Sequence, residues 1–101
     1  MKPVIIHNDA KAELDDAVAY YETREKGLGL DLQTEVETGV LKLRKYPIVF
    51  PPHKNSGFRK YFVESFPYTI FFMELPEIIW VAAIAHTSRR PNYWRNRSLT
   101  D

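Results

Sequence analysis

The sequence predicts one α+β domain, residues 1–101, in which a helical hairpin covers a single sheet. Three observations support this prediction: a short β-branched run opens the chain, two amphipathic helical patterns follow it, and three β-rich runs separated by short breaks come after them. A chain of 101 residues has room for a single hydrophobic core. We therefore expect an N-terminal strand, an α-helical hairpin, a three-stranded antiparallel meander that completes one sheet, and a basic aromatic C-terminal tail.

The first strand and the first helix follow from the opening residues. The run PVIIH, residues 3–7, is β-branched and apolar, which predicts a short strand. Asn8 or Asp9 can cap the helix that comes next. The apolar positions of that helix recur at i, i+3, i+4 and i+7 and are Leu14, Ala17, Val18 and Tyr21. Acidic side chains, Glu13 among them, occupy the other side, and the helix is expected to end near Gly27.

The second helix is expected to begin after the GLG of residues 27–29 and to end before Pro47, which cannot continue a helix. Its apolar stripe consists of Leu32, Val36, Val40 and Leu43. Gly39 inside this helix costs about 1 kcal/mol relative to alanine. We expect that cost to be offset by close approach of the first helix, so that the two helices form a hairpin.

The second half of the chain predicts the meander. Residues 47–57 contain three prolines and a glycine and are expected to form an irregular connection. The three β-rich runs that follow are GFRKYFVES, PYTIFFMEL and IIWVAAIAH. Because the last run is apolar on both faces, we expect a central strand that the helices cover on at least one side.

The sequence indicates neither a cofactor nor a metal site. His7, His53 and His86 are far apart with no paired spacing, and the GLGL segment lacks the third glycine of a phosphate-binding loop. Asp15 and Asp16 lie on the solvated side of their helix. With no cysteine, no long apolar run and no secretory signal in MKPVIIHND, we expect a cytoplasmic protein without membrane contact.

The basic end of the chain is its second half. Residues 1–50 carry seven basic against nine acidic residues, a net −2, whereas residues 51–101 carry seven against four, a net +3. The segment HTSRRPNYWRNR, residues 86–97, combines four arginines with a tyrosine and a tryptophan, a mixture that suits phosphates or carboxylates. Alternatively, Tyr93 and Trp94 pack the tail onto the sheet and the arginines only keep it soluble. Both interpretations can hold together.

Several segments in this order resemble one protein family. They are ELDDAVAYYE, GLGLDLQTEVETGVLKL, KYPIVFPP, FRKYFVESFPYTIFF and AIAHTSRRPNYWRNR. Over nearly the entire chain they resemble the RelE/ParE superfamily of bacterial toxins. The resemblance implies the same order of strands and helices, and a small toxin encoded beside an antitoxin that wraps and neutralises it.

The superfamily divides into two branches with different activities. RelE-like members are ribosome-dependent mRNA endonucleases, whereas characterised ParE-like members poison DNA gyrase. Arg59 matches the first basic strand position of the nucleases, but Tyr68 stands where their next catalytic arginine is expected. Arg89 matches the strand-end arginine loosely, and Tyr93 aligns with the tail tyrosine. Because one cation that would stabilise a phosphorane is absent, the resemblance favours the ParE branch.

We therefore expect the toxin of a type II toxin–antitoxin module, forming a hetero-oligomer with its antitoxin and acting by binding a cellular target, with DNA gyrase as the candidate. The residues expected to bind the target or the antitoxin are Arg59, Lys60, Tyr68, His86, Arg89, Arg90, Tyr93, Trp94, Arg95 and Arg97. The alternative is a metal-independent mRNA endonuclease on the ribosome, with catalytic residues Arg59, His86, Arg89 and Tyr93. A non-toxic binding module and a general nucleic-acid-binding domain are the remaining alternatives.

Overall fold

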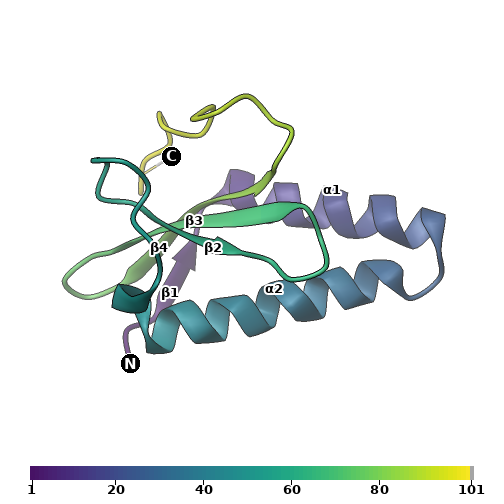
Figure 1. Cartoon of the computed structure of the whole chain (residues 1–101), viewed down its shortest axis with the longest axis horizontal. Helices are drawn as coiled ribbons and strands as arrows, with labels where there is room; N and C mark the ends of the chain where they lie inside the picture. Colours follow the sequence, from purple (N-terminus) through teal and green to yellow (C-terminus); the bar gives the residue numbers. More distant parts are fainter. Residues whose placement is uncertain (101) are drawn as a thin grey trace.

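The computed structural model describes residues 1–100 and contains two helices and one four-stranded sheet (Figure 1). In chain order the elements are β1 (Val4–Ile6), α1 (Asn8–Arg24), α2 (Leu28–Lys45), a short 3-10 helix η1 (Pro47–Val49), β2 (Arg59–Phe62), β3 (Tyr68–Glu74) and β4 (Ile79–His86). Residues 87–100 form turns without a helix or strand. The α+β class and the predicted order of elements are confirmed.

The strands lie in the order β1-β4-β3-β2, so the predicted central position of the last strand is confirmed. The meander is antiparallel as expected: β2 pairs with β3, and β3 pairs with β4. The sheet as a whole is mixed, because β1 pairs with β4 in parallel, with Ile5 opposite Trp80. The intervening helices and strands return the chain so that β4 runs beside β1 in the same direction.

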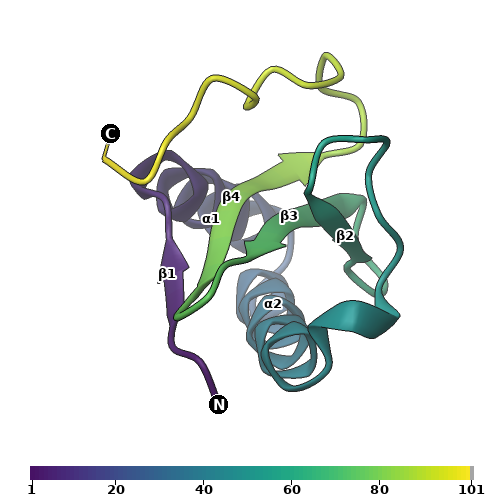
Figure 2. The ribbon, with the colours of Figure 1, turned by 90° about the vertical axis from the view of Figure 1, so that its left-hand side faces the viewer.

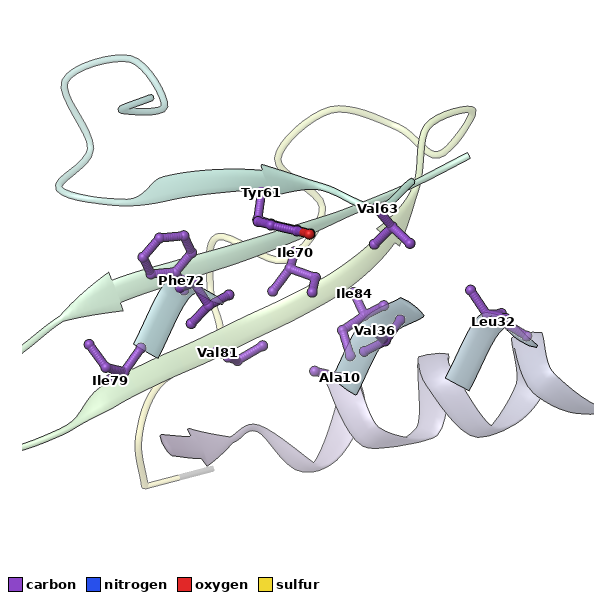
Figure 3. Packing of buried hydrophobic residues seen from close by; sticks show 12 residues of the cluster. Ala10, Leu32, Val36, Tyr61, Val63, Ile70, Phe72, Ile79, Val81 and Ile84 are labelled. Atoms are coloured by element: carbon purple, nitrogen blue, oxygen red, sulfur yellow. The ribbon is translucent and has the colours of Figure 1, made fainter. Parts of the chain in front are cut away.

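Each face of the sheet carries its own apolar core. On the face toward the helices, Ile70 and Phe72 of β3 and Ile84 of β4 pack against Leu32 and Val36 of α2 (Figure 3). On the opposite face a second cluster is formed by Phe58, Trp80, Ala82, Ala83, Ala85 and Trp94. Figure 2 shows the C-terminal tail crossing this second face, away from α2. β4 therefore contributes apolar side chains to the cores on both faces of the sheet.

Two local expectations about the helices are wrong. The side chain that caps α1 belongs to His7, whose Nδ1 accepts a hydrogen bond from the backbone N–H of Asp9 at 3.0 Å, because the helix already begins at Asn8. Gly39 makes room for the ring of Tyr61 in β2, since a Cβ there would lie 2.5 Å from a ring carbon. The glycine that permits close approach of α1 is Gly29.

No helix in the described part of the chain is both long and apolar enough to cross a membrane.

Candidate functional site: the clasped basic tail

Trp94 fixes the tail to the sheet. Its side chain is only 2% exposed and stacks on Phe71 of β3, with ring centroids 4.5 Å apart and an angle of 27° between the planes. The ring of Phe58 meets that of Trp94 edge to face, with centroids 4.8 Å apart, and the centroid of the His53 ring lies 5.8 Å from that of Trp94. His53 in turn places its Nε2 2.9 Å from Oδ1 of Asn92, which ties the loop before β2 to the tail. Trp94 therefore acts as the anchor, and its ring is closed to a partner.

A second attachment, which we call the Glu13 clasp, consists of Glu13, Tyr93 and Arg97. The guanidinium of Arg97 donates to both carboxylate oxygens of Glu13, at 2.9 and 3.2 Å, and the Tyr93 hydroxyl donates to the same carboxylate. The backbone N–H of Ile84 donates to it as well, at 3.0 Å. Side-chain exposure is 14% for both Glu13 and Arg97, so this ion pair is largely withdrawn from water.

The clasp also reaches the irregular part of β4. In the register of β3 and β4, Phe71 faces Ala83 but Phe72 faces Val81, so Ala82 is an extra residue at a β-bulge. Arg97 donates to the carbonyl oxygen of Ala82 at 2.9 Å. One arginine thereby joins helix α1, the bulge and the tail, which explains why the tail keeps a defined path without secondary structure.

The electrostatics of the clasp follow from its burial. The pKa of Tyr93 is raised, because burial disfavours the phenolate and the adjacent Glu13 carboxylate accepts its proton in a hydrogen bond. Burial alone would lower the pKa of Arg97, but the hydrogen bond and charge of Glu13 outweigh it and raise the pKa. Both side chains are thus held as proton donors to Glu13.

The remaining tail arginines face outward. The guanidinium of Arg89 lies 4.1 Å from the ring centroid of Tyr93, a cation–π contact. Arg90 and Arg95 are exposed, and within residues 1–100 their side chains form no ion pair or hydrogen bond. The unneutralised positive charge of the tail is therefore concentrated on these three residues.

His86 and Tyr68 form an aromatic pair at the end of the sheet. They are directly opposite in the register of β3 and β4, and their rings meet edge to face at 5.1 Å. The backbone N–H of Ser88 donates to Nδ1 of His86 at 3.0 Å. Because an amide can only donate, Nδ1 is the acceptor and the neutral ring carries its hydrogen on Nε2. His86 thus presents a donor to its surroundings. Burial and the nearby Tyr21 raise the pKa of Tyr68.

Arg59 and Lys60 do not join this group. Arg59 lies opposite Phe72, four residues along β3 from Tyr68, which places it roughly 13 Å from the His86 end of the sheet. Its guanidinium donates to the carbonyl oxygen of Phe50 at 2.8 Å and so supports the loop before β2. Lys60 extends over Phe62 on the outer strand.

A pocket of about 210 Å³ separates the basic tail from the ends of β3 and β4. It is lined by His53, Thr69, Phe71, Ala85, His86, Thr87, Arg89, Arg90, Pro91, Asn92, Tyr93 and Trp94. Aromatic and aliphatic side chains form its walls, and basic side chains stand at its rim. Among residues 1–100, no three side chains of His, Asp or Glu converge in a way that could hold a metal ion.

The chain is a small toxin domain of the RelE/ParE superfamily, in its ParE branch. The model of the family described as "ParE toxin of type II toxin-antitoxin system, parDE" matches residues 4–91, and the chain belongs to this family. A solved structure titled "Chromosomal ParDE TA system from P. aeruginosa" is similar with a TM-score of 0.75, covering 87% of this chain and 98% of that one. At 20% identity this similarity concerns the fold alone. No curated protein matches the sequence significantly.

Proposed function

We propose that this chain is a toxin that arrests growth by binding a cytoplasmic protein, with DNA gyrase as the candidate target, and that a cognate antitoxin neutralises it. Membership of the ParE family supports the toxin class. The observation that favours binding over catalysis is that the nuclease candidates are divided between two ends of the sheet. Arg59 supports a loop at one end, while His86, Arg89 and Tyr93 gather at the other.

Proton transfer is also unfavourable at the second end. A general base must offer a lone pair near the ribose hydroxyl. Tyr93 donates its proton to Glu13, and its raised pKa keeps that proton in place. Neutral His86 carries a hydrogen on Nε2 because Nδ1 is occupied by Ser88. This geometry supports a recognition surface made of hydrogen-bond donors and weighs against a metal-independent endonuclease.

The surface that we propose for recognition consists of Arg89, Arg90 and Arg95, which we call the arginine rim. Exposed arginines bind carboxylates through paired N–H donors, and the charge is free for a partner because no described acidic residue neutralises it. Trp94 and Arg97 are left out of this surface, since both are buried in the attachment of the tail. We propose that the antitoxin neutralises the toxin partly by covering the rim.

The experiment is induction of the chain alone in bacteria, with DNA breaks and ribosome-associated message cleavage read together. We expect growth arrest with DNA breaks and intact messages. Cleaved messages would establish the endonuclease alternative, and normal growth would indicate a non-toxic relative. DNA or RNA binding by the isolated chain with steep salt dependence would instead identify a general nucleic-acid-binding domain.

A paired variant tests the surface. Arg89→Ala with Arg90→Ala should weaken toxicity and antitoxin binding together. The matched control changes Lys11 and Lys26, two exposed lysines on or beside α1, and removes the same charge elsewhere. Unchanged toxicity and unchanged antitoxin affinity in the arginine variant would refute the rim as the recognition surface.

A further inference from the structure

The pocket beside the arginine rim contains a buried hydroxyl that has no hydrogen-bond partner among residues 1–100. Thr69 is 5% exposed, lines this pocket, and makes no side-chain hydrogen bond to any residue among 1–100. No fully sealed polar side-chain atom lacks a partner in the described chain, so the Thr69 hydroxyl must be open to the pocket. A hydroxyl held at this depth costs free energy unless it is hydrogen-bonded, which makes it a position built for a ligand or an ordered water.

The charge around the pocket is positive. His86 borders the pocket at the end of β4, and its ring packs against Tyr68. Arg89 and Arg90 bring positive charge to the opening. The amide oxygen of Asn92 already lies 2.9 Å from His53, and no Asp or Glu is among the residues that line the pocket. No carboxylate borders the pocket and two arginines do, so its charge favours an anion.

Shape distinguishes between kinds of anion. Nucleic acids bind through bases stacked on open aromatic faces, but Trp94 is 2% exposed and its face is already stacked on Phe71. Pockets for small-molecule ligands usually exceed about 300 Å³. A volume of about 210 Å³ with apolar walls from Phe71, Ala85 and Pro91 suits one side chain. An acidic side chain offers aliphatic carbons to these walls and a carboxylate to the donors.

We propose that this pocket receives the carboxylate of a single acidic side chain from a protein partner, with Thr69 and Arg90 as its hydrogen-bond donors. The inference rests on the proposed function for the existence of a protein partner. It adds the chemistry of recognition: one glutamate or aspartate enters the pocket, flanked by apolar residues that lie over the tail.

The test is an NMR titration of the full chain with the acetylated, amidated tripeptide Leu-Glu-Leu, its Leu-Gln-Leu counterpart and pentathymidylate. We expect the glutamate peptide to shift the backbone amide signals of Thr69, His86 and Arg90, and to bind roughly tenfold more tightly than the glutamine peptide, since a charged hydrogen bond is lost. Thr69→Val should weaken binding of the glutamate peptide, because the buried donor is lost. Thr34→Val, the same change at an exposed position of α2, should retain that binding.

The proposed role of the pocket would be refuted by any of three results: equal binding of the two peptides, shifts confined to other parts of the chain, or a stronger response to pentathymidylate. These outcomes are separable from the proposed function. A chain that arrests growth but does not discriminate glutamate from glutamine retains its function and loses this recognition site. A chain that discriminates but does not arrest growth keeps the site and loses the toxin activity.

Discussion

Replacing Glu13 with alanine should release the C-terminal tail and destabilise the whole domain. The substitution leaves the guanidinium of Arg97, 14% exposed, with its hydrogen bond to the carbonyl oxygen of Ala82 and, as its remaining ion pair among residues 1–100, a 3.8 Å contact to the exposed carboxylate of Asp9. It also removes the acceptor of Tyr93 and of the backbone N–H of Ile84. Removing one partner of a buried ion pair costs about 3 to 5 kcal/mol. Residual pairing with Asp9 places our expectation near the lower end, about 3 kcal/mol.

Thermal and urea unfolding, followed by circular dichroism and tryptophan fluorescence, measure this loss. For a domain of this size each 1 kcal/mol lowers Tm by roughly 4 to 8 °C, so we expect a decrease of about 12 °C or more. Asp15→Ala removes an exposed carboxylate from the same helix and should change stability by no more than about 0.5 kcal/mol. Similar stabilities of Glu13→Ala and Asp15→Ala would refute the structural role of the clasp.

Two further predictions concern pH and helix packing. The pKa of Tyr93 is higher in the folded chain than its unfolded value near 10, so the folded state holds this proton more tightly; the resulting stabilisation is complete below about pH 10 and is lost as the pH rises above it. Between about pH 9 and pH 12, the free energy of unfolding in urea should therefore fall more steeply for the wild type than for Tyr93→Phe. The variant should keep a smaller slope, because the pKa of Tyr68 is also raised. Equal slopes would contradict the prediction. Gly29→Ala should destabilise the hairpin, because its Cβ would lie 2.3 Å from the backbone carbonyl oxygen of Val18. The neighbouring atom is a backbone oxygen, so the strain is at the upper end of its usual range, about 3 kcal/mol, and exceeds the gain of about 1 kcal/mol in helix propensity. Urea unfolding that finds an equally stable variant would refute this reading.

Sequence periodicity predicts the fold well because each element buries a regular stripe. The helical spacing of Leu32, Val36 and Leu43 and the doubly apolar run of β4 both correspond to observed core positions. Periodicity could not identify the neighbour of Gly39, since the glycine indicates a close approach without saying which element approaches. The pairing of β1 with β4 likewise depends on the path of the whole chain.

The site was harder to predict because its members come from opposite ends of the chain. Glu13 belongs to the polar side of an amphipathic helix, and its partner Arg97 is 84 residues away in sequence. The sequence does not distinguish the four tail arginines from one another, yet Arg97 is paired with Glu13, whereas Arg90 pairs with no acidic side chain among residues 1–100. Thr69 carried no sequence signal at all, because a threonine in a strand is ordinary and only the pocket makes its hydroxyl unusual.

The clasp and the pocket are linked by the order of residues in the tail. Arg89 and Arg90 lie between the end of β4 and two attachments, Trp94 and the Glu13 clasp, so their placement over the pocket depends on both. Cations on a loose tail would attract an acidic partner from many directions, whereas cations held beside the Thr69 hydroxyl select one geometry. Loss of Glu13 should therefore weaken partner binding even where the domain remains folded. Recognition and stability share the same contacts, and a partner that fills the pocket should in turn raise the Tm of the chain.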